Sequence, residues 1–174
     1  DMLVSSSEQI QGRAYHFSDE VAQKIAAMPE IEIAAPMRVA SFTYGGEEIS
    51  LSAHEMDKYF ASSPDLLDFG DPVQARAATA RGEGALISTN FSLRTGLGLG
   101  DRLKIDAPNG TIELPIVGML DYFRSQKGTV FIDRSLYKKY WNDSSVDYVF
   151  INLKPGVDRA AFKQKLQQTL SGEH

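Results

Sequence analysis

The chain has 174 residues, 43% of them apolar, which is enough to bury one hydrophobic core or two small ones. Its 18 Lys and Arg residues are outnumbered by 23 Asp and Glu residues, and this formal net charge of −5 argues against a nucleic-acid partner. Cysteine is absent, which excludes disulfides, thiolate zinc sites and cysteine nucleophiles. No stretch approaches the ~20 apolar residues of a membrane span. Because the chain opens on a strand-like segment at residues 2–4 without a signal peptide, we expect it to be cut from a longer protein.

The first predicted elements are a helix and a hairpin. Ser18 is a suitable N-cap, and the apolar spacing that follows predicts a helix over residues 19–28, which Pro29 ends. Apolar and polar residues then alternate with period two across residues 33–53. The pair Gly45-Gly46 interrupts this alternation, and two glycines favour a tight turn, so the segment is predicted to be a β-hairpin.

The next segment has no clear period. Residues 54–71 are predicted to be irregular, because Pro and Gly interrupt them. Asp71-Pro72 supplies a capping side chain followed by a proline at the first helical position. The alanine-rich residues 73–81 are therefore predicted to form a short helix.

The remaining elements are inferred from the same signals. They are a strand at 85–87, a brief helix capped by Ser88 or Thr89 that stops at Gly96, a hairpin with its turn at Asn109-Gly110, a strand at 129–132, a helix capped by Asp133, a strand at 146–153, and a final helix capped by Asp158. Strands and helices interleave, but hairpins lie between them. We therefore expect an α/β (α+β) fold with mixed rather than uniformly parallel sheets.

A glycine-rich segment, residues 96–100, has the composition of a nucleotide-binding loop but not its context. A dinucleotide-binding loop follows a strand and opens a helix, whereas this segment closes a helix and leads into a strand. A phosphate loop ends in Lys and Ser or Thr, and Asp101 stands here instead. A helix C-cap and turn explain these glycines better.

The side chains that most often carry chemistry are scattered. The three histidines, His16, His54 and His174, lie far apart, and none has the spacing of a zinc site. Asp65, Asp68 and Asp71 do not match a calcium loop and are interpreted as turn and capping residues. No Gly-x-Ser-x-Gly elbow is present, so a hydrolase would rest on His16 or His54 without further support. We predict no catalytic, metal-binding or cofactor-binding residue.

Two groups of aromatic residues stand out. Three on one short predicted helix, Tyr137, Tyr140 and Trp141, have the spacing of a core-facing stripe. The pair Tyr122-Phe123 instead follows a strand and precedes a polar loop. It is a candidate partner contact, and a buried anchor for the loop is the alternative.

Three short motifs follow one another from Gly84 onward. They are Gly84 to Ser88, the glycine-rich turn from Gly96 through Gly98 to Gly100-Asp101, and the strand that ends at Ile116-Val117-Gly118. In their order and residue types, these motifs resemble the extracytoplasmic domain of FtsX-like, or MacB-like, ABC transporter permeases. Gly98 stands where the family more often has a longer polar side chain. The residues expected to carry the family's structural motif are Gly84, Ser88, Gly96, Gly100, Asp101 and Gly118.

The resemblance implies a two-part domain. Residues 1–53 and 146–174 would form a chain-end α/β unit, and residues 54–145 an inserted mixed unit. It also implies a location at the cell membrane, on the extracytoplasmic (periplasmic) side. The partners would be transmembrane helices of the same permease, a cytoplasmic ABC ATPase and a periplasmic protein or cargo.

The implied function is non-catalytic. The domain would couple a partner ATPase to substrate export or extraction, by conformational change or by contact with a partner or cargo. A stand-alone secreted or periplasmic binding or adaptor domain is the alternative, and a hydrolase is a third. Membrane spans and an ATPase gene in the flanking sequence would favour the permease.

Overall fold

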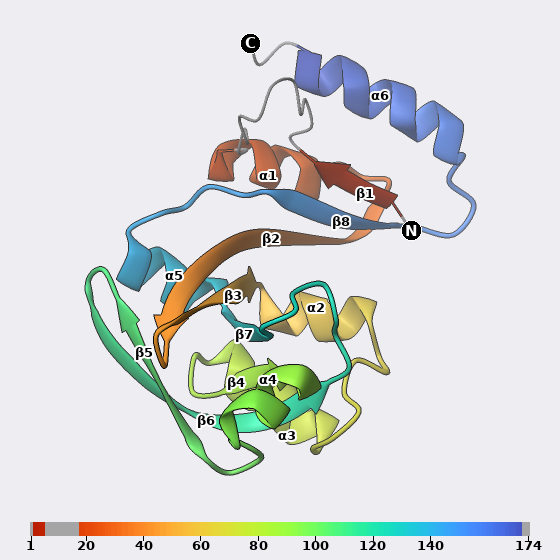
Figure 1. Ribbon diagram of the computed structural model, residues 1–174. Coiled ribbons are helices and arrows are strands. Elements are labelled where there is room, and N and C mark those ends of the chain that lie inside the picture. Colours follow the sequence, from red (N-terminus) through yellow and green to blue (C-terminus); the bar gives the residue numbers. More distant parts are fainter. Residues whose placement is uncertain (1, 6–17, 172–174) are drawn as a thin grey trace. The chain divides into compact units, whose positions relative to one another are not determined.

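The computed structural model describes residues 2–5 and 18–171, and within them the chain forms eight strands and six helices (Figure 1). None of the helices in these ranges is long and apolar enough to cross a membrane. The chain divides into two compact units. One contains residues 1–36 and 145–174 and is called the chain-end unit; the other contains residues 37–144 and is called the middle unit.

The chain-end unit is built from both ends of the described chain. Strand β1 (Met2–Ser5) pairs antiparallel with β8 (Tyr148–Leu153), and β8 neighbours β2 (Ile31–Tyr44), whose first six residues belong to this unit. Helices α1 (Asp19–Ala26) and α6 (Arg159–Ser171) complete it. A separate core holds the unit together, and its largest members are Ile25, Met28, Ile31, Ile151, Phe162 and Leu166.

The caps of both helices in this unit match the sequence prediction. Ser18 Oγ accepts a hydrogen bond of 3.3 Å from the Val21 amide at the start of α1. At the start of α6, the Asp158 carboxylate accepts from the amides of Ala160 and Ala161 at 2.9 and 3.2 Å. These bonds satisfy backbone donors that have no partner inside the helix.

The middle unit contains the remainder of the mixed sheet. Its strands follow the order β2, β3 (Glu47–His54), β7 (Thr129–Asp133), β4 (Ala85–Ser88), β6 (Gly110–Leu120) and β5 (Arg102–Ala107). The β3–β7 and β4–β6 pairs are parallel, whereas the β2–β3, β4–β7 and β5–β6 pairs are antiparallel. The predicted mixed α/β class is confirmed.

Helices cover both faces of the sheet in the middle unit. Helices α2 (Met56–Ser62) and α3 (Pro72–Ala80) pack through Phe60 and Ala75 on the face that carries Leu86 and Phe131. Helices α4 (Thr89–Thr95) and α5 (Arg134–Trp141) pack in a second buried cluster, on the opposite face of the sheet. This cluster contains Ile87 and Val130, which lie next to Leu86 and Phe131 in the sequence. Successive side chains of a strand point to opposite faces, so β4 and β7 supply both cores.

Two sequence predictions were wrong in detail. Residues 54–71 were expected to be irregular, but they include α2, on which Met56 and Phe60 are buried. The second hairpin was expected to turn at Asn109-Gly110, but Ala107 pairs with Gly110, so the two turn residues are Pro108 and Asn109. A proline that fixes its own φ in a two-residue turn was not considered.

The observed division of the chain also differs from the expected boundary at residue 53. Strand β3 lies in the middle unit, because residues 50–54 pair with β7 and Leu51 is buried in the same core as Val130. The distal half of β2 accompanies β3 as its hairpin partner. Sequence periodicity identified the hairpin but not the strand with which it pairs.

Candidate functional site of the middle unit

Two of the motif glycines occupy positions where a side chain would collide with its neighbours. A Cβ at Gly84 would lie 2.9 Å from a methyl carbon of Val117. A Cβ at Gly118 would lie 2.9 Å from methyl carbons of both Leu67 and Leu86. These distances are shorter than van der Waals contact allows, so glycine lets β6 approach its neighbours closely.

The other motif residues form the turn that leads into β5. Gly96 ends α4 with φ of +76°, and Gly100 has φ of +86°. Asp101 closes this turn, because its carboxylate accepts a 2.9 Å hydrogen bond from the Gly98 amide. Its backbone also accepts from Ile116 at 2.8 Å, which fastens the turn to β6.

Ser88, the remaining motif residue, lies fully buried at the end of β4. Its hydroxyl donates to Asn90 Oδ1 at 2.5 Å and accepts from the Thr129 amide at 2.9 Å. It occupies the N-cap position of α4 but makes no capping bond there. The Ser88 hydroxyl thus links the end of β4 to the start of β7.

The aromatic pair after β6 divides between two environments. Tyr122 is half-buried and packs edge-on against Phe131, with ring centroids 5.1 Å apart, while the Arg124 guanidinium lies 5.8 Å from its ring. Phe123 is 71% exposed. Tyr122 therefore anchors the loop, and Phe123 is presented to solvent.

The loop that carries Phe123, residues 121–128, is held at several points. Thr89 Oγ1 donates to Asp121 Oδ1 at 2.8 Å, and Asn90 Nδ2 donates to the Ser125 carbonyl at 2.8 Å. Both donors lie on α4, which also carries Leu93, 87% exposed and missed by the sequence analysis. The one sequence signal for the exposure of Leu93 was helical spacing, since a helix that buries Phe91 turns Leu93 away from the core.

The residues considered for catalysis do not assemble into a site in the described part of the chain. His54 is buried, its Nε2 lies 2.7 Å from Ser52 Oγ, and its ring stacks on Tyr59 with centroids 3.9 Å apart. Burial lowers the pKa of His54 to about 3. A histidine that is neutral and inaccessible to a substrate cannot act as a general base for an external reaction. His16 and His174 lie outside the described residues.

The acidic residues of the predicted turn are also accounted for individually. Asp71 Oδ1 accepts from the amides of Val73 and Gln74, each at 3.0 Å, and so caps α3. Asp68 Oδ2 accepts from the Asp121 amide at 2.6 Å, and Asp65 is exposed. No group of three or more metal-ligating side chains occurs within residues 2–5 and 18–171.

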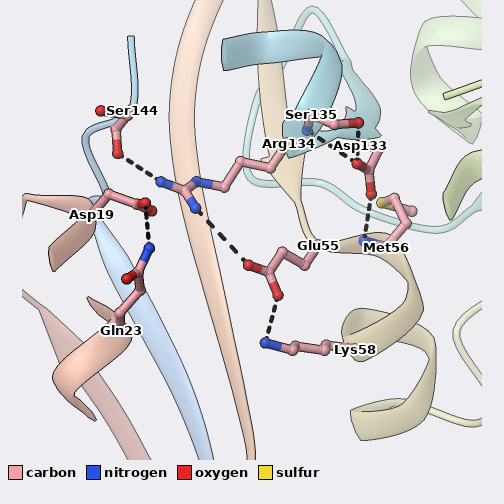
Figure 2. Close-up of polar contacts among 9 residues, drawn as sticks. All are labelled: Asp19, Gln23, Glu55, Met56, Lys58, Asp133, Arg134, Ser135 and Ser144. Carbon is pink, nitrogen blue, oxygen red and sulfur yellow. Dashed lines mark hydrogen bonds and ion pairs between the residues drawn. The ribbon is translucent and has the colours of Figure 1, made fainter. Parts of the chain in front are cut away.

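A polar cluster surrounds the last residues of the middle unit. Arg134, nearly fully buried, donates from Nη2 to the Ser144 carbonyl at 2.6 Å, and its Nη1 lies 4.0 Å from Glu55 Oε1 (Figure 2). The neighbouring Asp133 accepts from the Met56 amide at 3.0 Å and from Ser135 (Figure 2). The cluster therefore ties the start of α5 to the start of α2 and to the segment that leaves the unit.

The family can be decided by comparison with known proteins. The sequence profile described as "MacB-like periplasmic core domain" matches residues 1–169. The chain belongs to this family. It is 23% identical over 176 aligned positions to an uncharacterized ABC transporter permease of Mycobacterium tuberculosis, an alignment that covers 99% of this chain but 21% of that protein. The chain therefore spans about a fifth of the length of this curated relative.

Solved structures of a periplasmic region and of an extracellular domain of two transporters share the fold. The periplasmic region of MacB from Actinobacillus actinomycetemcomitans superposes with a TM-score of 0.72 at 12% identity, covering 99% of this chain and 82% of that one. The extracellular domain of the transporter YknZ from Gram-positive bacteria gives 0.68 at 13% identity, covering 99% and 92%. At such identities the likeness concerns the fold alone.

Proposed function

We infer that this MacB-like domain works without chemistry of its own, on the extracytoplasmic side of the cell membrane, within an ABC transporter permease. There it couples ATP hydrolysis by a cytoplasmic partner ATPase to export or extraction of a substrate. The motif residues Gly84, Ser88, Gly96, Gly100, Asp101 and Gly118 have a structural role in this proposal. The transmembrane helices of the same permease and a periplasmic protein or cargo are the other partners.

The observation that carries the proposal is the division of the chain into two units with separate cores. The chain passes between the units twice, at residues 36–37 and 144–145. Each unit has its own buried cluster, so each can move as a rigid body. Coupling between distant sites requires an element with two arrangements, and the two-unit organisation supplies a candidate.

Contact with a partner or cargo is assigned to the loop of Tyr122 and Phe123. Tyr122 fixes the loop on Phe131, and Phe123 is exposed on it. A large, exposed aromatic side chain on an anchored loop has the properties of an interface anchor, since little conformational freedom is lost when it binds.

The role of movement can be tested in the intact permease with its ATPase. Cysteine pairs are introduced, with one residue in 18–36 or 145–171 and the other in 37–144, and single-cysteine variants serve as controls. The described domain has no cysteine to interfere. Oxidation of a pair that cross-links is expected to stop transport while part of the ATP hydrolysis remains, and reduction is expected to restore transport. Unchanged transport by a fully cross-linked permease would exclude movement between the units.

The role of the loop has its own test. Phe123→Ser in the intact permease is expected to reduce transport without lowering the amount of folded protein. Leu3→Ser, which alters an exposed apolar residue of β1, is the matched control. Equal transport by the two variants would remove Phe123 from the proposal. Loss of transport in both would point to a general effect of polar substitution.

A further inference from the structure

A hollow of about 540 Å³ opens on the middle unit beside α3, lined by Gly70, Gln74, Ala77, Leu99 and Val117 among others. Its position follows from the irregular course of β6. Strand β5 pairs with β6 up to Pro115, and Phe69 forms an isolated bridge with Met119. Val117 falls between these two pairings, where the register with β4 also shifts.

The segment before α3 forms part of the wall of this hollow. A Cβ at Gly70 would lie 2.8 Å from the Val117 carbonyl oxygen and 3.6 Å from a methyl carbon of Leu99. Residue 70 therefore brings the chain directly onto β6, with Leu99 beside it. The wall is made from three segments that are far apart in the sequence, and this is why no local pattern revealed it.

A second hollow, of about 470 Å³, borders the same helix. It is lined by Phe60, Pro64, Val73, Arg76 and Ala77 among others. Helix α3 contacts both α2 and β6 (Figure 1). Ala77 lines both hollows, so the exposed side of α3 separates them, and its side chain at this point is small. We call this region, with its exposed apolar side chains Phe69, Val73 and Leu99, the α3 surface.

The α3 surface carries three exposed apolar side chains. Val73 is 77% exposed, Phe69 52% and Leu99 47%. Single exposed apolar side chains are common in soluble proteins, but several of them beside two hollows mark a surface that contacts another molecule. The small side chain of Ala77 lets that molecule approach the helix closely.

The basic side chains at the α3 surface already have acidic partners. Arg76 Nε lies 2.8 Å from Asp57 Oδ1, and Arg81 Nε lies 3.0 Å from Glu83 Oε2. Lys58 at the start of α2 pairs with Glu55 at 2.6 Å. The positive charge of this region is therefore balanced within the middle unit.

Three aspartates near the α3 surface are not used in these ion pairs. Asp65, Asp68 and Asp71 lie in the segment between α2 and α3, and within the described residues none of them forms an ion pair. Asp68 and Asp71 accept only backbone hydrogen bonds. The α3 surface thus combines exposed apolar side chains with uncompensated negative charge.

We propose that the α3 surface binds a segment of a partner polypeptide in which apolar side chains are interspersed with Lys or Arg. The apolar side chains enter the hollows on either side of Ala77, and the basic side chains meet Asp65, Asp68 and Asp71. An anionic lipid surface would be repelled by the same aspartates. This interaction goes beyond the coupling role and uses residues other than Tyr122 and Phe123.

The test measures binding of labelled peptides to the 174-residue chain by fluorescence anisotropy. One peptide consists of Leu and Lys, and the matched peptide of Leu and Glu. The Leu-Lys peptide is expected to bind, more weakly as the salt concentration rises, because exposed charges are screened within ~8 Å at physiological ionic strength. Val73→Ser and Leu99→Ser are each expected to raise its Kd about tenfold, the effect of one lost aliphatic contact.

Charge and position are tested with matched variants. Asp65→Asn is expected to raise the Kd roughly two- to fivefold, as for an exposed ion pair. Leu93→Ser and Glu48→Gln alter residues of α4 and β3 that are also exposed, and they should leave the Kd unchanged. Denaturation midpoints confirm that every variant is folded, and hydrogen exchange at residues 69–77 should slow when the peptide binds.

Several results would overturn the proposal. They are failure of the Leu-Lys peptide to bind, equal binding of the Leu-Glu peptide, equal effects of the control variants, and binding of anionic phosphatidylglycerol vesicles that Val73→Ser weakens. The measurement needs neither the membrane nor the ATPase. Its failure would therefore leave the coupling proposal standing, and failure of the cross-linking test would leave this one standing.

Discussion

Arg38 Nε donates a hydrogen bond of 2.9 Å to Asp143 Oδ2, which joins two residues 105 positions apart. The same oxygen accepts a 2.8 Å hydrogen bond from the Tyr137 hydroxyl. Arg38 is the second residue of the middle unit and Asp143 the next to last. This carboxylate therefore ties together, within the middle unit, the segments by which the chain enters and leaves it.

Removing the carboxylate should destabilise the middle unit. Asp143→Ala leaves a mostly buried guanidinium and a buried phenol without this partner, and we expect the free energy of unfolding to fall by about 1–3 kcal/mol. Asp143→Asn retains an oxygen acceptor and should cost less. Urea denaturation measures both. Glu48→Ala, an exposed control, should change stability by less than about 0.5 kcal/mol, and a similar effect of Asp143→Ala would show that the bonds contribute little.

Gly118→Ala tests the close approach of β6 to its neighbours. The new methyl group would lie 2.9 Å from methyl carbons of Leu67 and Leu86, so we expect a loss of about 1–3 kcal/mol from overpacking. Gly98→Ala is the matched control, since apart from its own residue and its two chain neighbours no atom would lie within 4 Å of the new Cβ. Equal denaturation midpoints for the two variants would contradict the packing role of Gly118.

Gly100→Val tests backbone conformation instead of packing. Its Cβ would meet nothing within 4 Å, but φ is +86°, which a β-branched residue adopts only under strain. We expect a loss of about 1–3 kcal/mol. Gly98→Val, two residues earlier and outside the positive-φ region, should cost less. If both variants unfolded at the same denaturant concentration, strain at residue 100 would not be the reason for glycine.

The fold could be predicted from the sequence wherever the signal is local. The turn at Gly45-Gly46 and the N-caps Ser18, Asp71, Asp133 and Asp158 were identified because each depends on residues within a few positions. The boundary of the middle unit was not, because it depends on pairing between residues 50–54 and 129–133. Period-two alternation shows that a segment is a strand, but it does not show with which distant strand that segment pairs.

Of the two candidate contact surfaces, one could be predicted from local sequence and the other could not. The exposed Phe123 was identified from its place after a strand. The α3 surface was missed, because Gly70 and Leu99 reach Val117 only in the folded chain, where Phe69 bridges to Met119 and the Gly100 amide donates to the Ile116 carbonyl. Asp65, Asp68 and Asp71 were interpreted only as turn and capping residues, and their negative charge next to exposed apolar side chains was not recognised.

Buried His54 should make the domain less stable in mild acid. Burial lowers its pKa from 6.5 to about 3, so between these pH values the unfolded chain binds a proton that the folded chain does not. Above about pH 6.5 the histidine is neutral in both the folded and the unfolded chain, so it does not lower the free energy of unfolding. As the pH is lowered toward 3, the free energy of unfolding falls. One proton corresponds to a slope of about 1.4 kcal/mol for each pH unit within this window.

The contribution of His54 is isolated by comparison with His54→Gln, measured by urea denaturation from pH 7 to pH 5. Over this range most carboxylates of both proteins are already ionised in the unfolded chain, and His16 and His174 are common to both, so their effects cancel in the difference. The substitution itself lowers stability at pH 7, because Gln does not reproduce the ring that stacks on Tyr59. Stability of the wild-type chain should nevertheless fall more steeply toward pH 5 than that of the variant. Parallel pH profiles would mean that His54 becomes protonated inside the folded domain, and therefore that water reaches its ring.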